Sequence, residues 1–83
     1  MRTLKDVLNT ITEDILCGNS TIAFEHGFEL PKLGTRAITM VDTTHIYYRN
    51  GDKKKLTTLN KQDLLKVEKS LREYIKFVMT STY

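Results

Sequence analysis

The chain has 83 residues, of which 40% are hydrophobic and 28% are charged, and its formal net charge is +3. This composition argues against intrinsic disorder and, at this length, predicts one small domain spanning residues 1–83. The apolar runs are too short to cross a membrane, the N-terminus has no apolar signal-peptide core, and the single cysteine cannot form an internal disulfide. We therefore expect a cytoplasmic protein without membrane association.

Positive charge is concentrated in the second half of the chain. Residues 1–48 carry four basic and six acidic side chains, whereas residues 49–83 carry nine basic and four acidic ones. Such an asymmetry is consistent with binding to nucleic acid, with binding to an acidic protein partner, or with a surface that only contacts solvent.

The N-terminal segment has the pattern of an amphipathic helix. Apolar residues recur every three or four positions from Leu4 to Leu16, which predicts one apolar stripe. Thr3 and Asp6 stand at the spacing of a capping box, and Gly18 provides a C-terminal stop. We predict one continuous helix between Thr3 and Gly18.

Strand patterns follow, with apolar and polar residues alternating. The predicted strands cover residues 21–30, 35–41, 44–49 and 53–59, with a turn over residues 31–34. In the second strand, strict alternation places Ile38 and Val41 on opposite faces.

An Asn-Gly dipeptide at residues 50–51 predicts a β-hairpin. A two-residue turn would pair Tyr48 with Lys53, and a longer, four-residue loop would pair Tyr47 with Leu56. We favour the longer loop, because it keeps Leu56 beside an aromatic residue and leaves Lys53 in solvent.

The last helix begins after Asn60, which has the properties of an N-cap, and its apolar face includes Leu64, Val67 and Leu71. The predicted element order is therefore α-β-β-β-β-α. This order indicates a small α+β domain in which an antiparallel sheet has both helices packed on one face.

The sequence contains no recognisable catalytic pattern. There is no glycine-rich phosphate loop, no nucleophile elbow and no paired set of metal ligands. Cys17 and His26 are expected to be buried structural residues. We therefore predict a protein that is not an enzyme and that binds neither a cofactor nor a metal.

Basic and aromatic residues cluster in the predicted hairpin. The candidate binding residues are Tyr47, Tyr48, Arg49, Lys53, Lys54 and Lys55. Tyrosine and arginine are common energetic centres of protein interfaces, and lysines steer association with acidic surfaces. The same residue types serve single-strand binders, in which aromatic rings stack on bases and lysines neutralise phosphates.

Two families resemble parts of this pattern. The run Lys-Lys-Leu-Thr-Thr-Leu-Asn at residues 54–60, leading into a helix, resembles the last strand and helix of single-stranded-DNA-binding transcriptional coactivators, over about a quarter of the chain. The element order is similar to that of double-stranded-RNA-binding domains. However, the Gly-Pro-x-His loop and the Lys-Lys-x-Ala-Lys helix start of that family are absent.

The sequence thus predicts a small non-catalytic adaptor or inhibitor, of a kind that phages and mobile elements encode. It would dock on a protein partner with an acidic surface through the basic hairpin and the last helix. The alternative is nucleic-acid binding by the same hairpin. Both a monomer and a homodimer formed through an unpaired strand edge agree with the sequence.

Overall fold

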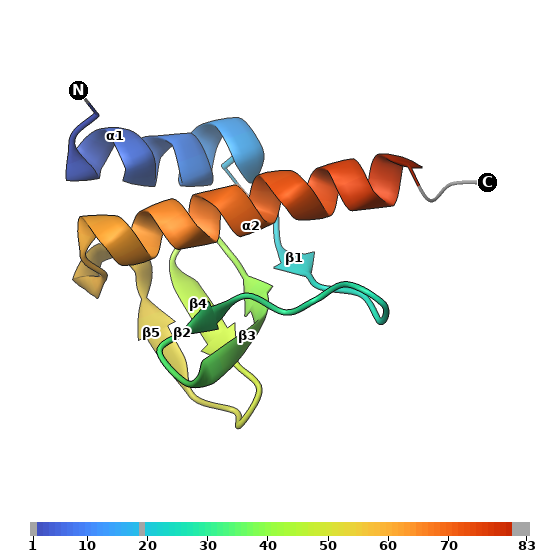
Figure 1. The fold of residues 1–83 in the computed structure, drawn as a ribbon. Helices are drawn as coiled ribbons and strands as arrows, with labels where there is room; N and C mark the ends of the chain where they lie inside the picture. The colour runs from blue at the N-terminus through green and yellow to red at the C-terminus, as the bar shows by residue number, and fades with distance from the viewer. Residues whose placement is uncertain (1, 19, 81–83) are drawn as a thin grey trace.

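An antiparallel sheet with a layer of helices on one face forms the fold (Figure 1). The computed structural model describes residues 2–18 and 20–80. The elements are α1 (Leu4–Asn9), the π-helix η1 (Thr10–Ile15), β1 (Ile22–Ala23), β2 (Lys32–Leu33), β3 (Arg36–Val41), β4 (His45–Tyr48), β5 (Lys53–Lys55), the 3₁₀-helix η2 (Leu56–Thr58) and α2 (Lys61–Thr80). The predicted α+β class is confirmed, and these described residues form five strands in place of the expected four.

The central strand β3 pairs with three neighbours. The strands follow one another across the sheet in the order β1-β3-β4-β5, and β2 pairs with β3 off this path. Ile22 of β1 lies opposite Val41, whereas Leu33 of β2 lies opposite Arg36 at the other end of β3. β1 and β2 therefore follow one another along one edge of β3, and β4 occupies the other edge.

The predicted strand over residues 21–30 is wrong beyond Ala23. The rings of Phe24 and Phe28 stack on each other at 5.5 Å between centroids, and each meets Tyr74 of α2 edge-on at 5.1 Å. Gly27 between them has a φ of +98°, which lies in the left-handed region that favours glycine. Alternation in this stretch therefore reflects two aromatic rings packed against a helix, and not a strand with one buried face.

Both helical segments and the sheet share one hydrophobic core. The residues with no exposed surface include Val7 and Ile11 from the N-terminal helices and Leu16 directly after them, Ile38, Val41 and Ile46 from the sheet, and Leu71 from α2. Burial of each such side chain contributes about 1.5–3 kcal/mol. The same core therefore fixes both helices on one side of the sheet, as the sequence predicts.

An irregularity in β3 changes which residues face this core. Ile38 lies opposite Tyr48 and Met40 lies opposite Tyr47, so two residues that are adjacent in β4 face two residues of β3 that are not adjacent. Thr39, between them, is the extra residue of a β-bulge. Ile38 and Val41 are both fully buried as a result. The prediction that these two side chains lie on opposite faces is therefore wrong.

The first helix changes type after Asn9. Its capping box is confirmed, because Asp6 N–H donates to the hydroxyl of Thr3 at 3.1 Å and Thr3 N–H donates to the carboxylate of Asp6 at 3.0 Å. Leu16 N–H then donates to the carbonyl of Ile11, five residues earlier, at 3.0 Å. The wider π-turn brings Ile11 and Leu16 onto one face, where both are fully buried. The predicted continuous α-helix is therefore corrected to two helical types.

The ends of the helices agree with the sequence in part. The N-cap of α2 is confirmed, because Asp63 N–H donates to the side-chain oxygen of Asn60 at 2.8 Å. At the end of the first helical segment, Cys17 has a φ of +52° and Gly18 has a φ of +81°. This left-handed geometry turns the side chain of Cys17 into solvent, so its predicted burial is wrong.

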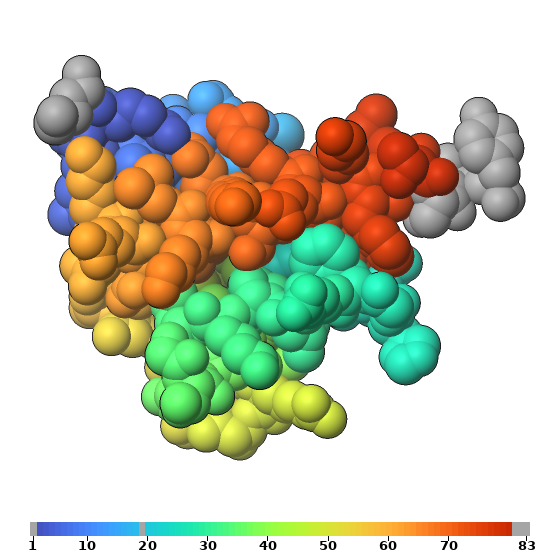
Figure 2. Space-filling model, in the orientation of Figure 1, coloured from blue at the N-terminus to red at the C-terminus, as the bar shows by residue number. Residues whose placement is uncertain are grey.

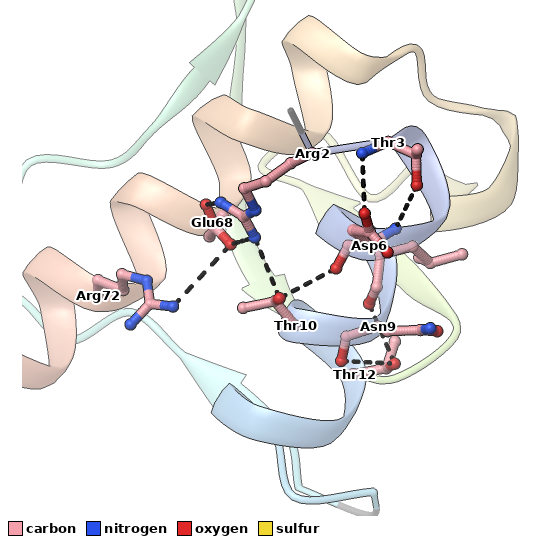
Figure 3. Close-up of polar contacts among 9 residues, drawn as sticks. Arg2, Thr3, Asp6, Asn9, Thr10, Thr12, Glu68 and Arg72 are labelled. Carbon is pink, nitrogen blue, oxygen red and sulfur yellow. Dashed lines mark hydrogen bonds and ion pairs between the residues drawn. The ribbon is translucent and has the colours of Figure 1, made fainter.

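An ion pair joins the N-terminal segment to α2 (Figure 3). Arg2 donates through both terminal nitrogens to the carboxylate of Glu68, one of them at 2.7 Å, and also to the hydroxyl of Thr10 at 3.0 Å. The side chain of Glu68 is only 8% exposed, and Arg72 approaches it at 4.0 Å. The hydrogen bond from Arg2 lowers the pKa of Glu68.

We expect Arg2→Ala to lower the free energy of unfolding by about 1–3 kcal/mol, because it leaves the nearly buried carboxylate of Glu68 without its bidentate hydrogen-bond donor. Urea denaturation would measure the change. Arg72→Ala, which removes only the longer contact, serves as the control and should change stability by less than about 0.5 kcal/mol. Equal losses in the two variants would show that the carboxylate does not depend on Arg2.

Candidate functional site

The β4–β5 hairpin carries all six predicted site residues. Across its ladder, His45 lies opposite Lys55, Ile46 opposite Lys54, and Tyr47 opposite Lys53. Tyr48 N–H donates to the carbonyl of Asp52 at 2.7 Å, so the loop consists of residues 49–51, and Gly51 has a φ of +96°. Both predicted registers are therefore wrong, because a three-residue loop that ends in a left-handed glycine closes this hairpin.

The two tyrosines of β4 point to opposite faces of the sheet. Tyr48 is 7% exposed and belongs to the hydrophobic core, and the guanidinium carbon of Arg36 lies 4.0 Å from its ring centroid. Tyr47 is half-buried on the face away from the helices, which we call the open face. The hairpin therefore offers one tyrosine ring on its open face in place of the predicted pair.

The three lysines of β5 are all exposed. Since residues opposite each other in a ladder share a face, Lys53 and Lys55 lie on the open face with Tyr47, and Lys54 lies on the helix side next to Ile46. Within residues 2–18 and 20–80, none of these lysines forms an ion pair. Their positive charge is therefore available to a partner from both sides of the sheet edge.

Arginines add to the positive charge around the loop. Arg49 is exposed at the start of the loop, and Arg36 of β3 forms an ion pair with Asp52. Together with Lys32 and Tyr48 they line an open hollow of about 420 Å³. The charge of Asp52, next to the loop, is therefore already balanced by Arg36, and the hairpin tip carries a net positive charge.

Asp42 organises the turn that leads into β4. One carboxylate oxygen accepts hydrogen bonds from the N–H groups of Thr44 and His45 at 2.8 and 2.6 Å and from the Thr44 hydroxyl at 3.0 Å. The other accepts the hydroxyl of Tyr47 at 2.7 Å. Partial burial raises the pKa of Asp42, but these hydrogen bonds outweigh it and lower the pKa to about 2.

The same contact fixes the orientation of the half-buried Tyr47 on the open face. The hydrogen bond to Asp42 raises the pKa of Tyr47, so the hydroxyl remains protonated and donates to the carboxylate. The ring is therefore held in place before any partner arrives, which reduces the entropy lost on binding.

Sequence reasoning missed the residues that support the hairpin from outside it. An aspartate two residues before a threonine is typical of a side-chain-stabilised turn, so the role of Asp42 next to Thr44 could have been predicted. The contributions of Arg36 and Lys32 depend on how β2 and β3 approach the loop, and no local pattern indicates them.

Other candidate groups do not converge. His26 is exposed, which corrects its predicted burial. Among residues 2–18 and 20–80, no three histidine, cysteine, aspartate or glutamate side chains lie close enough together to hold a metal ion. Within the same residues, no helix combines the length and the apolar character that crossing a bilayer requires.

In comparisons with known proteins, the chain matches no family model, no curated protein and no solved structure.

Proposed function

We propose that this chain is a non-catalytic cytoplasmic binding protein, an adaptor or inhibitor, that docks on the acidic surface of a protein partner through the β4–β5 hairpin. The observation that carries the proposal is the exposed row of Lys53, Lys54 and Lys55 along the sheet edge, beside the fixed ring of Tyr47. These lysines form no ion pair within residues 2–18 and 20–80. In this arrangement the lysines steer the encounter and the tyrosine provides a central contact.

The placement of the aromatic rings favours a protein over single-stranded nucleic acid. Binders of single strands stack successive bases on several exposed rings. Here Tyr48 belongs to the hydrophobic core, so the open face of the hairpin carries Tyr47 and the half-buried imidazole of His45, whose ring centroids lie 6.2 Å apart at an angle of 43°. A single tyrosine held by Asp42 beside several lysines resembles a protein-interface anchor with a basic rim more than a row of stacking rings.

The open face and the exposed surface of α2 lie on different sides of the molecule. Figure 2 shows α2, in orange to red, across the upper part of the molecule, and the β4–β5 loop, in yellow, projecting away from it. The exposed lysines of α2 include Lys66, Lys69 and Lys76. A single flat contact cannot cover both surfaces, so we assign the docking surface to the hairpin and use the helix as the control.

The test compares two variants with equal losses of charge. One carries Lys53→Ala, Lys54→Ala and Lys55→Ala, and the other carries alanine at the three exposed lysines of α2. The wild-type chain would serve as bait in a lysate of its source cells, and each captured protein would then be purified and titrated. We expect the hairpin variant to bind an acidic partner at least roughly tenfold more weakly, since several charge contacts are removed, and the helix variant to bind normally. Loss of partner binding in the helix variant alone would assign docking to α2 and overturn the proposal.

Fluorescence anisotropy with labelled single- and double-stranded DNA and RNA, at low and physiological salt, tests the alternative. Micromolar binding whose association constant falls by several powers of ten for each tenfold rise in salt concentration would indicate phosphate contacts. If this binding also disappears in the hairpin variant, the lysines make those contacts. This result would replace the proposed protein partner with nucleic acid. An absence of binding at low salt would support the protein partner.

A further inference from the structure

The outer edge of β5 is a strand edge with unused pairing capacity. β5 is the last strand of the path β1-β3-β4-β5, so one of its edges bonds to β4 and the other faces outward (Figure 1). β5 has three residues, whereas β1 and β2 have two each. β5 is therefore the longest of the outer strands in the part of the chain that the structure describes.

The hydrogen-bond pattern identifies which backbone groups point outward. Tyr48 N–H donates to the carbonyl of Asp52, and Leu56 N–H donates to the carbonyl of Thr44. In an antiparallel ladder such bonded pairs alternate with non-bonded pairs, so the backbone groups of Lys53 and Lys55 are directed away from β4.

One of these outward groups is already used within the chain. The hydroxyl of Thr58 donates to the carbonyl of Lys55 at 2.6 Å. In the part of the chain that the structure describes, the N–H and carbonyl of Lys53 and the N–H of Lys55 remain for an added strand. Three backbone groups in a row can pair with one extended segment.

Charge decides which strand this edge accepts. A second copy of β5 in antiparallel pairing would place lysines opposite lysines, and like charges directly opposite each other destabilise a sheet. An acidic strand would instead place carboxylates next to Lys53 and Lys55 on the open face. The edge therefore repels its own copy and attracts an acidic segment.

We propose, building on the proposed function, that an extended acidic segment of the partner protein adds to the sheet as a strand beside β5. The backbone of Lys53 and the N–H of Lys55 bond to this segment, and the lysine side chains pair with its carboxylates. The lysines select the partner and the backbone groups align it.

The first experiment separates the backbone from the charge. The probe is a fluorescent peptide in which glutamate and valine alternate, titrated with the full chain. Lys53→Pro removes the outward N–H and the charge, whereas Lys53→Ala removes only the charge, and proline is tolerated at an edge position whose N–H faces solvent. We expect the proline variant to bind at least roughly tenfold more weakly than the alanine variant, because it cannot form the ladder bond. Circular dichroism would confirm that both variants fold.

The second experiment uses the unmodified chain, so it does not depend on the folding of a variant. Amide hydrogen exchange would be measured with and without the peptide. We expect exchange at Lys53 and Lys55 to slow on binding, while the amide of Lys54, which already faces β4, changes little.

The outcomes separate the failure of this inference from the failure of the proposed function. Peptide binding without new protection at Lys53 and Lys55, and with equal affinity in the two variants, would overturn strand addition and leave an electrostatic protein-binding surface. No peptide binding by the wild-type chain would overturn strand addition, whereas the hairpin-dependent capture of an acidic protein would stand by itself. A wild-type dimer that Lys53→Pro converts to a monomer would assign the edge to a second copy of the chain.

Discussion

Replacing Asp42 with alanine is expected to lower the free energy of unfolding by about 2–4 kcal/mol, because one carboxylate accepts four hydrogen bonds in the turn before β4. Without it, the N–H of the partly buried His45 and the hydroxyl of Tyr47 lose their partner. The measurement is urea denaturation of both proteins at neutral pH. Tyr47→Phe removes only one of the four bonds and should lower stability by clearly less than Asp42→Ala.

The pH dependence of the free energy of unfolding, compared between wild type and Asp42→Ala, provides a second check. The pKa of Asp42 in the folded chain is about 2, below its ordinary value of 3.8, so the ionised form favours the folded state. This contribution is present above about pH 4 and is lost as the pH falls toward 2. The stability difference between wild type and Asp42→Ala should therefore narrow by about 1–2 kcal/mol over that range. A constant difference would show that the charge of Asp42 contributes nothing.

Local patterns in the sequence were sufficient for several elements. The capping box at Thr3 and Asp6, the N-cap at Asn60 and the hairpin around Gly51 are each encoded within a few neighbouring residues. The apolar stripe of α2 is similarly local, because residues three and four positions apart share a helix face. These features are therefore predictable without knowledge of the rest of the fold.

Features that depend on distant residues were not predictable. Alternation in the region of Phe24 and Phe28 suggested a strand, but their contacts with Tyr74 come from a helix about fifty positions later. No local pattern indicates that Glu68 of α2 pairs with Arg2, which lies 66 positions earlier in the chain. Such contacts follow from packing, which one sequence does not specify locally.

The candidate site was predictable as a segment but not as a surface. The sequence placed six residues in one hairpin, and the pairing of β4 with β3 then places Tyr48 in the core and the half-buried Tyr47 on the open face. A shift of one residue in this pairing would exchange these roles, since successive side chains of a strand point to opposite faces. The three-residue loop ending at Gly51 in turn fixes the register of β5, and so places Lys53 and Lys55 on the same face as Tyr47.

Leu71→Ala is expected to lower the free energy of unfolding by about 2–5 kcal/mol, because the Leu71 side chain has no exposed surface and its removal leaves a cavity in the shared core. A small domain of about 5–15 kcal/mol total stability would lose a large fraction of it. Urea denaturation followed by circular dichroism would give the change, provided that the slope of the free energy of unfolding against urea concentration is the same in both proteins.

Leu65→Ala is the matched control, because it removes the same atoms from the same helix at a side chain that is 37% exposed. Its effect should stay within about 0.5 kcal/mol. A large difference between the two variants requires that α2 lies on the sheet through the face that carries Leu71. That arrangement leaves the far side of the sheet, with Tyr47 and the lysines of β5, uncovered by the helix. Equal effects would mean that α2 packs through a different face, and the open face of the hairpin would then lose its structural basis.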